Sequence, residues 1–475
     1  MASTVAVVLP GDDVAGRTDA ARGAMLGLAV RALRDAGVHE VVALDVPDGY
    51  TATPGTTLRE TDGSLQQTLT VAADTARTGH HDRILLHRVD HALTPAAQIG
   101  RVLASLDGGA AVTVPVLPVT DTITAVTDGV LGRTVDRADV RAVCSPWGFT
   151  RAALDRAAAA ATDLRPAPVD EALRRAGTAG ATPGRVSAVP GSPAGASLAD
   201  EVSRRRLALV HRDAAPLLLS TARLTTAGAG PSSDVLLRAG RVAAVVLAAG
   251  SGTRFGAPVN KAYLPLGGET VLAHSLRLFA GLRAVGPIVL VVREQDEEYA
   301  RTVAADVGVP VEFVRGGASR QGSEDAALDH LASRIADGSV EIVAIHDSAR
   351  PLTTATLCRA VLSVAVRDGG AVPGVLRTEL AVVTSDGTEL LPDRAGPLVA
   401  VQTPQAFRAR LLRKAYDTAH GADFEGTDTA SVVAAHGGLR ARWVPSPATN
   451  LKITFAEDLP LAEHLLREQG EDRGD

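Results

Sequence analysis

The residues best suited to chemistry lie in one segment, LAAGSGTRFGAPVNKAYLPLGG (247–268). Its small residues can bring several backbone N–H groups close to a phosphate and form an anion-binding nest; they are Ala248, Ala249, Gly250, Ser251 and Gly252. Arg254 adds a planar fork for phosphate oxygens, and Lys261 adds a compact positive charge. A glycine-rich loop alone is more often a structural turn, but a loop with both cations indicates a polyphosphate site. No GxGxxG pattern opens a helix here, and the phosphate-loop sequence GKS or GKT is absent.

Lysine is rare in this chain. Of its 48 lysine and arginine residues, only Lys261, Lys414 and Lys452 are lysines. In a chain that uses arginine at nearly every cationic position, a lysine indicates a position where a compact ammonium is needed and the wider guanidinium of arginine does not serve. Lys414 lies in the helical pattern RARLLRKAYDTA and is interpreted as a solvated residue. Lys261 and Lys452 therefore remain as candidates for the chemistry.

Short apolar runs alternate with helical patterns along the chain, which is typical of an α/β sheet with helices on both faces. We expect strands at 242–247, 288–292 and 340–345, and helices at 270–282 and 409–419. The glycine-rich loop follows the first of these strands directly.

The length of 475 residues exceeds what one ordinary core holds, so two domains are expected. Residues 223–240 are rich in glycine, serine and threonine and predict a linker between domains 1–222 and 241–475.

The first domain repeats the second in outline. Val5–Leu9 leads into Pro10 and Gly11, as the strand at 242–247 leads into its glycine-rich turn. The segment LLHRVDHALTPAA (85–97) parallels AIHDSARPLTTAT (344–356), and residues 136–154 parallel residues 393–411. Two copies of one α/β domain explain these parallels better than chance.

The composition excludes several classes of protein. Hydrophobic residues make up 46% of the chain, charged residues 21%, and the net charge of -6 argues against a general nucleic-acid binder. The first ten residues read as a strand rather than a signal peptide, and no run of about 18 apolar residues occurs. Cys144 and Cys358 show no metal-ligand spacing. We therefore expect a cytoplasmic protein with no membrane or nucleic-acid partner.

Seven ordered motifs give the second half a close resemblance to the 2-C-methyl-D-erythritol 4-phosphate cytidylyltransferase family, over about 242–466. They are LAAGSGTRFG, NKAYLPLGG, RGGASRQGS (315–323), HDSARP (346–351), QTPQAF (402–407), GTDTAS (426–431) and NLKIT (450–454). The resemblance implies two tandem Rossmann-like nucleotidyltransferase domains arranged as a pseudo-dimer, each a mainly parallel sheet with helices on both faces. It implies transfer of CMP from CTP to a sugar-alcohol phosphate in the non-mevalonate isoprenoid pathway.

Roles for single residues follow from the same resemblance. The residues that hold the cytosine and ribose of CTP would be Ala248, Ala249, Gly250, Gly317 and Ser323. Arg254 and Lys261 would brace the triphosphate, and Lys452 would lie at the α-phosphate. Asp347, Arg350 and Thr427 would line the acceptor pocket, whereas Thr429 replaces a residue that is usually acidic and is given no role.

The chemistry agrees with these roles, because in-line attack on the α-phosphorus depends mainly on positioning and electrostatic stabilisation. The nucleophile is a phosphate monoester with a second pKa of about 6, so it arrives largely deprotonated and needs no general base. His346 is accordingly interpreted as structural. Mg²⁺ or another divalent cation would be held mainly by the CTP phosphates, with Asp347 as its one protein ligand.

The first half resembles a degenerate copy of the same domain. Its loop carries Asp12 and Asp13 where phosphates should lie, it contains no lysine, and Arg88 replaces the aspartate of the HDSARP motif. The segment 114–126 nevertheless keeps the family's projecting arm, with Asp121 and Thr122, and Arg137 follows at the usual spacing.

The second half departs from the family at these same places, with Arg377 in place of an aspartate and a shifted Arg394. The resemblance implies homodimers in which each arm supplies a threonine and an arginine to the partner's acceptor pocket. We therefore expect Thr122 and Arg137 to complete the second half's site within one chain. The alternative is that Arg137 is a surface residue of an inert, stabilising domain.

Two further alternatives stay open for the function. The acceptor could be ribitol 5-phosphate or another polyol phosphate instead of 2-C-methyl-D-erythritol 4-phosphate. The chain could also be an inactive scaffold built from two degraded copies, against which the intact Arg254, Lys261, Asp347 and Lys452 argue.

Overall fold

The computed structural model describes most of the chain, and all structural statements below concern these residues. They are 3–10, 19–62, 64–160, 186–192, 238–250, 260–377, 379–391, 397–447, 449–454 and 458–471. Several residues singled out in the sequence lie outside them: Asp12, Asp13, Ser251, Gly252, Arg254 and Arg394, with most of the expected linker.

The chain forms two compact units, and each takes a segment from the other half of the sequence. The first unit comprises Met1–Thr120, Val135–Leu224 and Arg377–Gly396; the second comprises Asp121–Thr134, Thr225–Leu376 and Pro397–Asp475.

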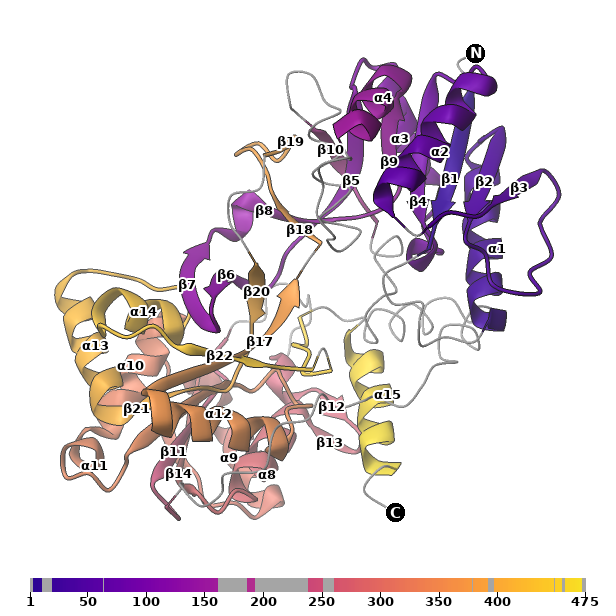
Figure 1. Ribbon diagram of the computed structural model, residues 1–475. Coiled ribbons are helices and arrows are strands. Elements are labelled where there is room, and N and C mark those ends of the chain that lie inside the picture. Colours follow the sequence, from indigo (N-terminus) through magenta and orange to yellow (C-terminus); the bar gives the residue numbers. More distant parts are fainter. Residues whose placement is uncertain are drawn as a thin grey trace. The chain divides into compact units, whose positions relative to one another are not determined.

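The first unit has one mixed sheet whose central strands are parallel (Figure 1). Its strands are β1 (Thr4–Leu9), β2 (Glu40–Leu44), β3 (Thr56–Arg59), β4 (Arg83–Arg88), β5 (Val112–Pro118), β8 (Val140–Val143), β9 (Trp147–Thr150), β10 (Val186–Pro190), β18 (Leu380–Val382) and β19 (Glu389–Leu390). Its helices are α1 (Asp19–Asp35), α2 (Leu65–Thr78), α3 (Ala96–Asp107) and α4 (Arg151–Ala160). The last two strands come from the second half of the sequence and pair antiparallel with β8 and β10.

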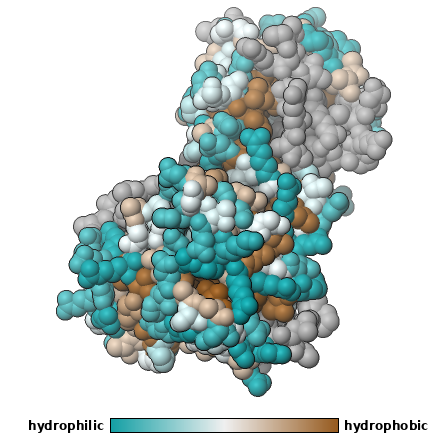
Figure 2. Space-filling model, turned by 90° about the vertical axis from the view of Figure 1, so that its left-hand side faces the viewer, coloured by the Kyte–Doolittle hydropathy of each residue, from teal (hydrophilic) through white to brown (hydrophobic). Residues whose placement is uncertain are grey.

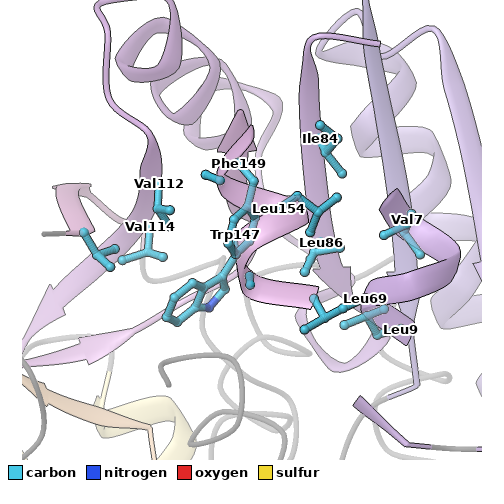
Figure 3. Close-up of a cluster of buried hydrophobic side chains, with 14 of the residues drawn as sticks. Val7, Leu9, Leu69, Ile84, Leu86, Val112, Val114, Trp147, Phe149 and Leu154 are labelled. Atoms are coloured by element: carbon cyan, nitrogen blue, oxygen red, sulfur yellow. The ribbon is translucent and has the colours of Figure 1, made fainter. Parts of the chain in front are cut away.

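Apolar residues on both faces of this sheet form its core. On one face, α2 and α4 cover a cluster that includes Leu69, Leu86, Trp147 and Phe149, as Figure 3 shows. On the other face, α1 and α3 cover a second cluster around Val30 and Ile99. Strands buried on both faces explain why the sequence shows continuous apolar runs instead of alternation.

The second unit contains a second, larger set of elements. Its strands are β6 (Thr122–Thr127), β7 (Val130–Val135), β11 (Val242–Leu247), β12 (Pro265–Leu266), β13 (Glu269–Thr270), β14 (Val285–Val292), β15 (Glu312–Arg315), β16 (Ile342–Asp347), β17 (Gly370–Arg377), β20 (Leu398–Val401), β21 (Gln405–Arg408) and β22 (Arg442–Pro445). Its helices are α8 (Val271–Ala280), α9 (Glu297–Val307), α10 (Arg320–His330), α11 (Ala332–Ala336), α12 (Ala355–Asp368), α13 (Ala409–Gly421), α14 (Thr429–His436) and α15 (Asp458–Glu471). The strands and helices predicted from the sequence are confirmed to within a few residues.

Helices cover both faces of the second sheet. Helices α10, α13 and α14 share one cluster of buried residues, and α8 and α9 share another on the opposite face, with α12 beside them. The N-terminus of α14 is fixed by a capping box, in which Asp428 accepts from the N–H of Ser431 at 2.9 Å.

The two units share one strand order. The first reads β3-β2-β1-β4-β9-β5 and the second reads β15-β14-β11-β16-β21-β17. The sense of pairing also agrees, because the strand after the fourth, β9 or β21, runs antiparallel to it in both units. The α/β fold expected for both halves is present in each, but the sheets are mixed rather than mainly parallel, because pairs such as β4–β9 and β16–β21 are antiparallel.

The second unit ends in a small closed ring of strands. Its order is β17-β20-β6-β7-β22, and parallel pairing of β17 with β22 closes it. Strands β6 and β7 come from the first half of the sequence, and Leu131 of β7 lies in the core cluster of α10 and α13. A segment expected to project from the first half is thus an integral part of the second unit.

The surface of the molecule on the side drawn in Figure 2 is mainly hydrophilic where it is coloured, with smaller hydrophobic areas between. None of the helices in the described ranges has the length and hydropathy needed to span a bilayer.

Candidate functional site

The candidate site lies at the carboxyl ends of the parallel strands β11 and β16. These strands pair in register so that Leu247 faces Asp347. The glycine-rich loop therefore begins beside Asp347, and the N–H of Ser348 donates to the Leu247 carbonyl at 3.1 Å. Ligands of open α/β sheets bind at this edge.

Asp347 lies between two cations. Arg320 donates from Nη1 to Oδ1, and Lys452 donates from Nζ to Oδ2 at 2.7 Å. The Asp347 N–H donates to Thr403 Oγ1 at 3.0 Å. Burial alone would raise the pKa of Asp347, but the charges of Arg320, Lys452 and Arg350 hold this pKa well below its ordinary value. Asp347 is therefore a carboxylate at neutral pH.

Arg320 is held in turn by Glu324, one turn later on α10. The distance from Arg320 Nε to Glu324 Oε1 is 2.9 Å, and Glu324 is only 1% exposed. Its carboxylate also accepts hydrogen bonds from Tyr416 and, at 3.0 Å, from Thr429. Burial raises the pKa of Glu324, although Arg320 opposes the shift. Glu324, Arg320, Asp347 and Lys452 thus form a row of alternating charges.

The two lysines singled out in the sequence meet at this site. Lys261 lies in the short helix Lys261–Tyr263, and its Nζ donates to the carbonyl of Ile453, the neighbour of Lys452, at 2.8 Å. The N–H of Ile453 donates to the Ala349 carbonyl at 2.8 Å, which joins the NLKIT segment to the HDSARP loop.

Arg350 is almost fully buried, with 2% exposure. Its Nη1 donates to the Asn450 carbonyl at 2.9 Å, and its Nη2 donates to Asp121 Oδ1 at 2.8 Å. Its guanidinium therefore organises the wall of the site from behind rather than facing solvent.

The loops after β11 and β15 approach each other closely at Gly316, and the next residue, Gly317, packs against the first turn of α10. A Cβ on Gly316 would lie 2.5 Å from the Cβ of Ala249, and one on Gly317 would lie 2.7 Å from the carbonyl carbon of Gly322. Neither position admits a side chain without movement of the backbone. Ser323 is buried beside them and donates to the Ser319 carbonyl at 2.9 Å.

His346 is buried beside Asp347, and its Nδ1 lies 3.2 Å from Thr403 Oγ1. Burial lowers the pKa of His346 to about 3, so the imidazole is neutral at physiological pH. This environment suits a structural histidine.

The described residues do not fit a protein-held divalent cation. No cluster of three or more His, Cys, Asp or Glu side chains that could hold a metal occurs among them. Both oxygens of Asp347, the expected ligand, accept hydrogen bonds from Arg320 and Lys452. Each Asp347 oxygen is thus engaged by a cation of the protein, although a carboxylate oxygen can accept a second contact.

The structure brings most of the described predicted site residues together in the second unit. They are Ala248, Ala249, Lys261, Gly317, Ser323, Asp347, Arg350 and Lys452, with Gly250 in the loop that follows β11. Thr427 is exposed beside Asp428, the residue that caps α14. Thr122 begins β6 and pairs with Val401. Arg137 belongs to the first unit, where its Nη1 donates to the Thr120 carbonyl at 3.0 Å.

Four residues that build this site were given no site role from the sequence: Asp121, which was named only as part of the arm, and Arg320, Glu324 and Asn450. Arg320 and Asn450 lie inside motifs that the sequence offered, RGGASRQGS and NLKIT, and Asp121 persists in the arm pattern. The side chains of these three residues could have indicated a role in the site, since each is charged or can form hydrogen bonds and lies beside an expected ligand loop. Glu324 directly follows RGGASRQGS and lies outside the motif. Thr429, given no role from the sequence, binds the Glu324 carboxylate.

The first unit repeats this hydrogen-bond frame with different side chains. The buried His87 lies 2.9 Å from Ser145 Oγ, which accepts from the N–H of Arg88 at 3.0 Å, as Thr403 accepts from Asp347. The Arg88 side chain, which occupies the position of Asp347, forms a buried pair with Asp90 at 2.6 Å. The first unit thus keeps the hydrogen bonds to the backbone, but Arg88, paired with Asp90, stands where the second unit has its central carboxylate.

Comparisons with known proteins point to one family. The family model described as IspD, 2-C-methyl-D-erythritol 4-phosphate cytidylyltransferase, matches residues 30–195 and 242–468. The chain is 36% identical over 242 residues to the protein of that name from Solibacter usitatus, covering 48% of this chain and 97% of the relative. It is 39% identical over 230 residues to the one from Symbiobacterium thermophilum, covering 48% and 94%. The crystal structure of the Thermus thermophilus protein of that name, 31% identical, covers 47% of this chain and 98% of that chain with a TM-score of 0.38.

Proposed function

The chain belongs to the 2-C-methyl-D-erythritol 4-phosphate cytidylyltransferase family, and we propose that one active site, built on its second half and including a segment of its first half, performs the reaction. The chain is a nucleotidyltransferase that transfers CMP from CTP to 2-C-methyl-D-erythritol 4-phosphate, in the non-mevalonate pathway to isoprenoids. The observation that best supports the site is Asp347, placed between Arg320 and Lys452 beside the loop after β11.

In this reaction an oxygen of the acceptor's phosphate attacks the α-phosphorus of CTP. A new P–O bond forms, the bond from the α-phosphorus to the bridging oxygen breaks, and pyrophosphate leaves with the electron pair. Negative charge on the α-phosphate oxygens is stabilised by Lys452, with Lys261 and Arg254 bracing the triphosphate. No proton transfer is required of the protein, and the neutral, buried His346 takes no part.

CTP binds with its base and ribose at the loops after β11 and β15. Ala248, Ala249 and Gly250 supply the first wall, and Ser251 and Gly252 extend the phosphate nest. Gly317 and Ser323 supply the second wall. The support for this assignment is the close approach of Gly316 to Ala249, which brings the backbones of the two loops together.

The acceptor binds on the other side of Asp347. The Asp347 carboxylate accepts hydrogen bonds from the acceptor's hydroxyl groups, and Thr427 and Thr122 contribute further hydroxyls. Arg350 shapes this pocket from behind, in keeping with its burial. Binding of CTP draws Lys452 from Asp347 to the α-phosphate, which frees Asp347 Oδ2 for the acceptor.

The two halves act as an internal pseudo-dimer that arose by duplication. The identical strand order of the two units and the reciprocal exchange of β6 and β7 for β18 and β19 support this proposal. In a symmetric dimer each subunit must carry both an active site and the arm that completes its partner's site. In a fused pair, one copy can keep the arm while the other keeps the active site. Arg137 of the first half is proposed to bind the acceptor's phosphate.

Mg²⁺, or another divalent cation, accompanies the CTP phosphates rather than residing on the protein. On the protein, Asp347 is the residue proposed to contact this cation, and in the structure its oxygens bind Arg320 and Lys452.

Pyrophosphate release from CTP tests the function directly. The full chain is assayed with 2-C-methyl-D-erythritol 4-phosphate, with ribitol 5-phosphate and with no acceptor. We expect release to depend on the first acceptor. A larger kcat/KM for ribitol 5-phosphate would identify that polyol phosphate as the acceptor. No pyrophosphate release with either acceptor would indicate an inactive scaffold.

A further inference from the structure

We infer that Asp121, donated by the first half of the sequence, is a positioning residue for the acceptor pocket and acts by fixing the buried Arg350. This inference rests on the proposed function.

The contact itself joins distant parts of the sequence within the second unit. Asp121 Oδ1 accepts from Arg350 Nη2 at 2.8 Å, with side-chain exposures of 22% for the aspartate and 2% for the arginine. Arg350 Nη1 donates to the Asn450 carbonyl, while its Nε is buried without a hydrogen-bond partner in the described structure. Among the described residues, Asp121 is the one carboxylate that forms an ion pair with Arg350. A buried guanidinium without such a partner is strongly unfavourable.

The position of Asp121 is fixed by strand pairing. Thr122 follows it and pairs with Val401 at the start of the β6–β20 ladder. The next residues after β20 are Gln402 and Thr403, whose hydroxyl accepts from the Asp347 N–H. The ladder therefore sets the Asp121 carboxylate beside the same wall that holds Asp347.

Charge balance explains why the pocket needs this carboxylate. Arg320, Lys452 and Arg350 all lower the pKa of Asp347. Arg320 is balanced by Glu324 and Arg350 by Asp121. Without Asp121, Arg350 would lose its carboxylate partner and keep its hydrogen bond to the Asn450 carbonyl, and its charge would draw the Asp347 carboxylate toward it.

The first unit supplies an independent observation, because there both members of the pair have changed. In the parallel between residues 85–97 and 344–356, His91 occupies the position of Arg350. In the second half's own arm, Leu380 pairs with Ala142 as Ile123 pairs with Ala400, so Arg377 and Glu379, which pair with each other, lie on either side of the position of Asp121. The arginine and the aspartate are thus kept together in one unit and replaced together in the other.

The test compares Asp121→Asn, Asp121→Glu and Asp128→Asn in the full chain. Asp128 lies on the same segment, in the turn before β7, with a positive φ of 51° that asparagine adopts readily. It undergoes the same change of charge and is the matched control. The measurements are KM for 2-C-methyl-D-erythritol 4-phosphate, KM for CTP, kcat, and CTP affinity by calorimetry.

We expect Asp121→Asn to raise the acceptor KM by about tenfold or more, with CTP affinity within about twofold of wild type. Asp121→Glu should recover part of the loss, and Asp128→Asn should behave as wild type. A general loss of structure would instead lower CTP affinity as well. Unchanged acceptor KM in Asp121→Asn, equal effects of Asp121→Asn and Asp128→Asn, or loss of CTP binding together with acceptor binding would each overturn the inference. Failure of the wild-type chain to use this acceptor would refute the proposed function instead.

Discussion

Replacing Lys452 with alanine should separate catalysis from stability. The ammonium lies 2.7 Å from Asp347, yet the side chain is 33% exposed. Solvent screens an ion pair at such a position, so its loss should cost about 1 kcal/mol of unfolding free energy or less. Its effect on the rate should be much larger, because the ammonium lies where the reaction develops negative charge.

The size of that effect follows from the proposed contact with the α-phosphate. Two unit charges about 4 Å apart interact by about 4 kcal/mol at an effective dielectric constant of 20. Only part of this is specific to the transition state, so kcat should fall by about 10²–10³-fold, in line with the loss of one preorganised donor.

The assay measures kcat for pyrophosphate release at saturating CTP and acceptor, with thermal unfolding of the same samples. The control is Lys414→Ala, which removes the same charge from an exposed position on α13 and should leave both quantities unchanged. A Lys452→Ala protein with near-normal kcat would refute the assigned role. A folded protein is required for the comparison, so a large drop in melting temperature would refute the stability half of the reasoning.

Three further predictions address the remaining proposals. Calorimetric titration with CTP and Mg²⁺ should give about one site per chain, because Arg88 and Asp90 form an internal pair where the second unit has Asp347; a stoichiometry near two would contradict this. Arg137→Ala should raise the acceptor KM strongly and leave CTP binding nearly unchanged, while Arg394→Ala should do little; the opposite pattern would mean that chains pair through their second halves. Burial lowers the pKa of His346 to about 3, so only the unfolded chain takes up this proton between about pH 6.5 and 3, and stability should fall with decreasing pH by about 1.4 kcal/mol per unit for this group. Urea unfolding of wild type and His346→Gln at about pH 7 and 5.5 should show a shallower dependence in the variant, and equal slopes would contradict the assignment.

The sequence was sufficient where local pattern decides the structure. The apolar run of β11 leads into its glycine-rich loop as expected, and the scarcity of lysine drew attention to Lys261 and Lys452, which meet at one site. Both inferences depend on residues a short distance apart or on residue type alone.

Contacts set by the tertiary fold could not be predicted in the same way. Glu324 looks like an ordinary polar residue of a helix, and only the packing of α10 against α13 and α14 reveals that it is buried against Arg320, Tyr416 and Thr429. Thr429 stands where an acid was expected, while a carboxylate is supplied nearby by Glu324.

The exchange of strands between the two halves also escaped local reasoning. The sequence indicated that Thr122 would serve the second half, but the ring β17-β20-β6-β7-β22 depends on pairings between residues far apart in the chain. The Asp121–Arg350 pair exists only because of those pairings.

Phosphorus NMR of the complete reaction tests the central claim most directly. The full chain is incubated with CTP, Mg²⁺ and 2-C-methyl-D-erythritol 4-phosphate, and the phosphorus signals of the products are followed over time. We predict pyrophosphate and, in equal amount, a coupled pair of signals from an unsymmetrical diphosphate that joins CMP to the acceptor. Consumption of CTP to free CMP, with the acceptor's phosphate signal unchanged, would contradict transfer to that phosphate.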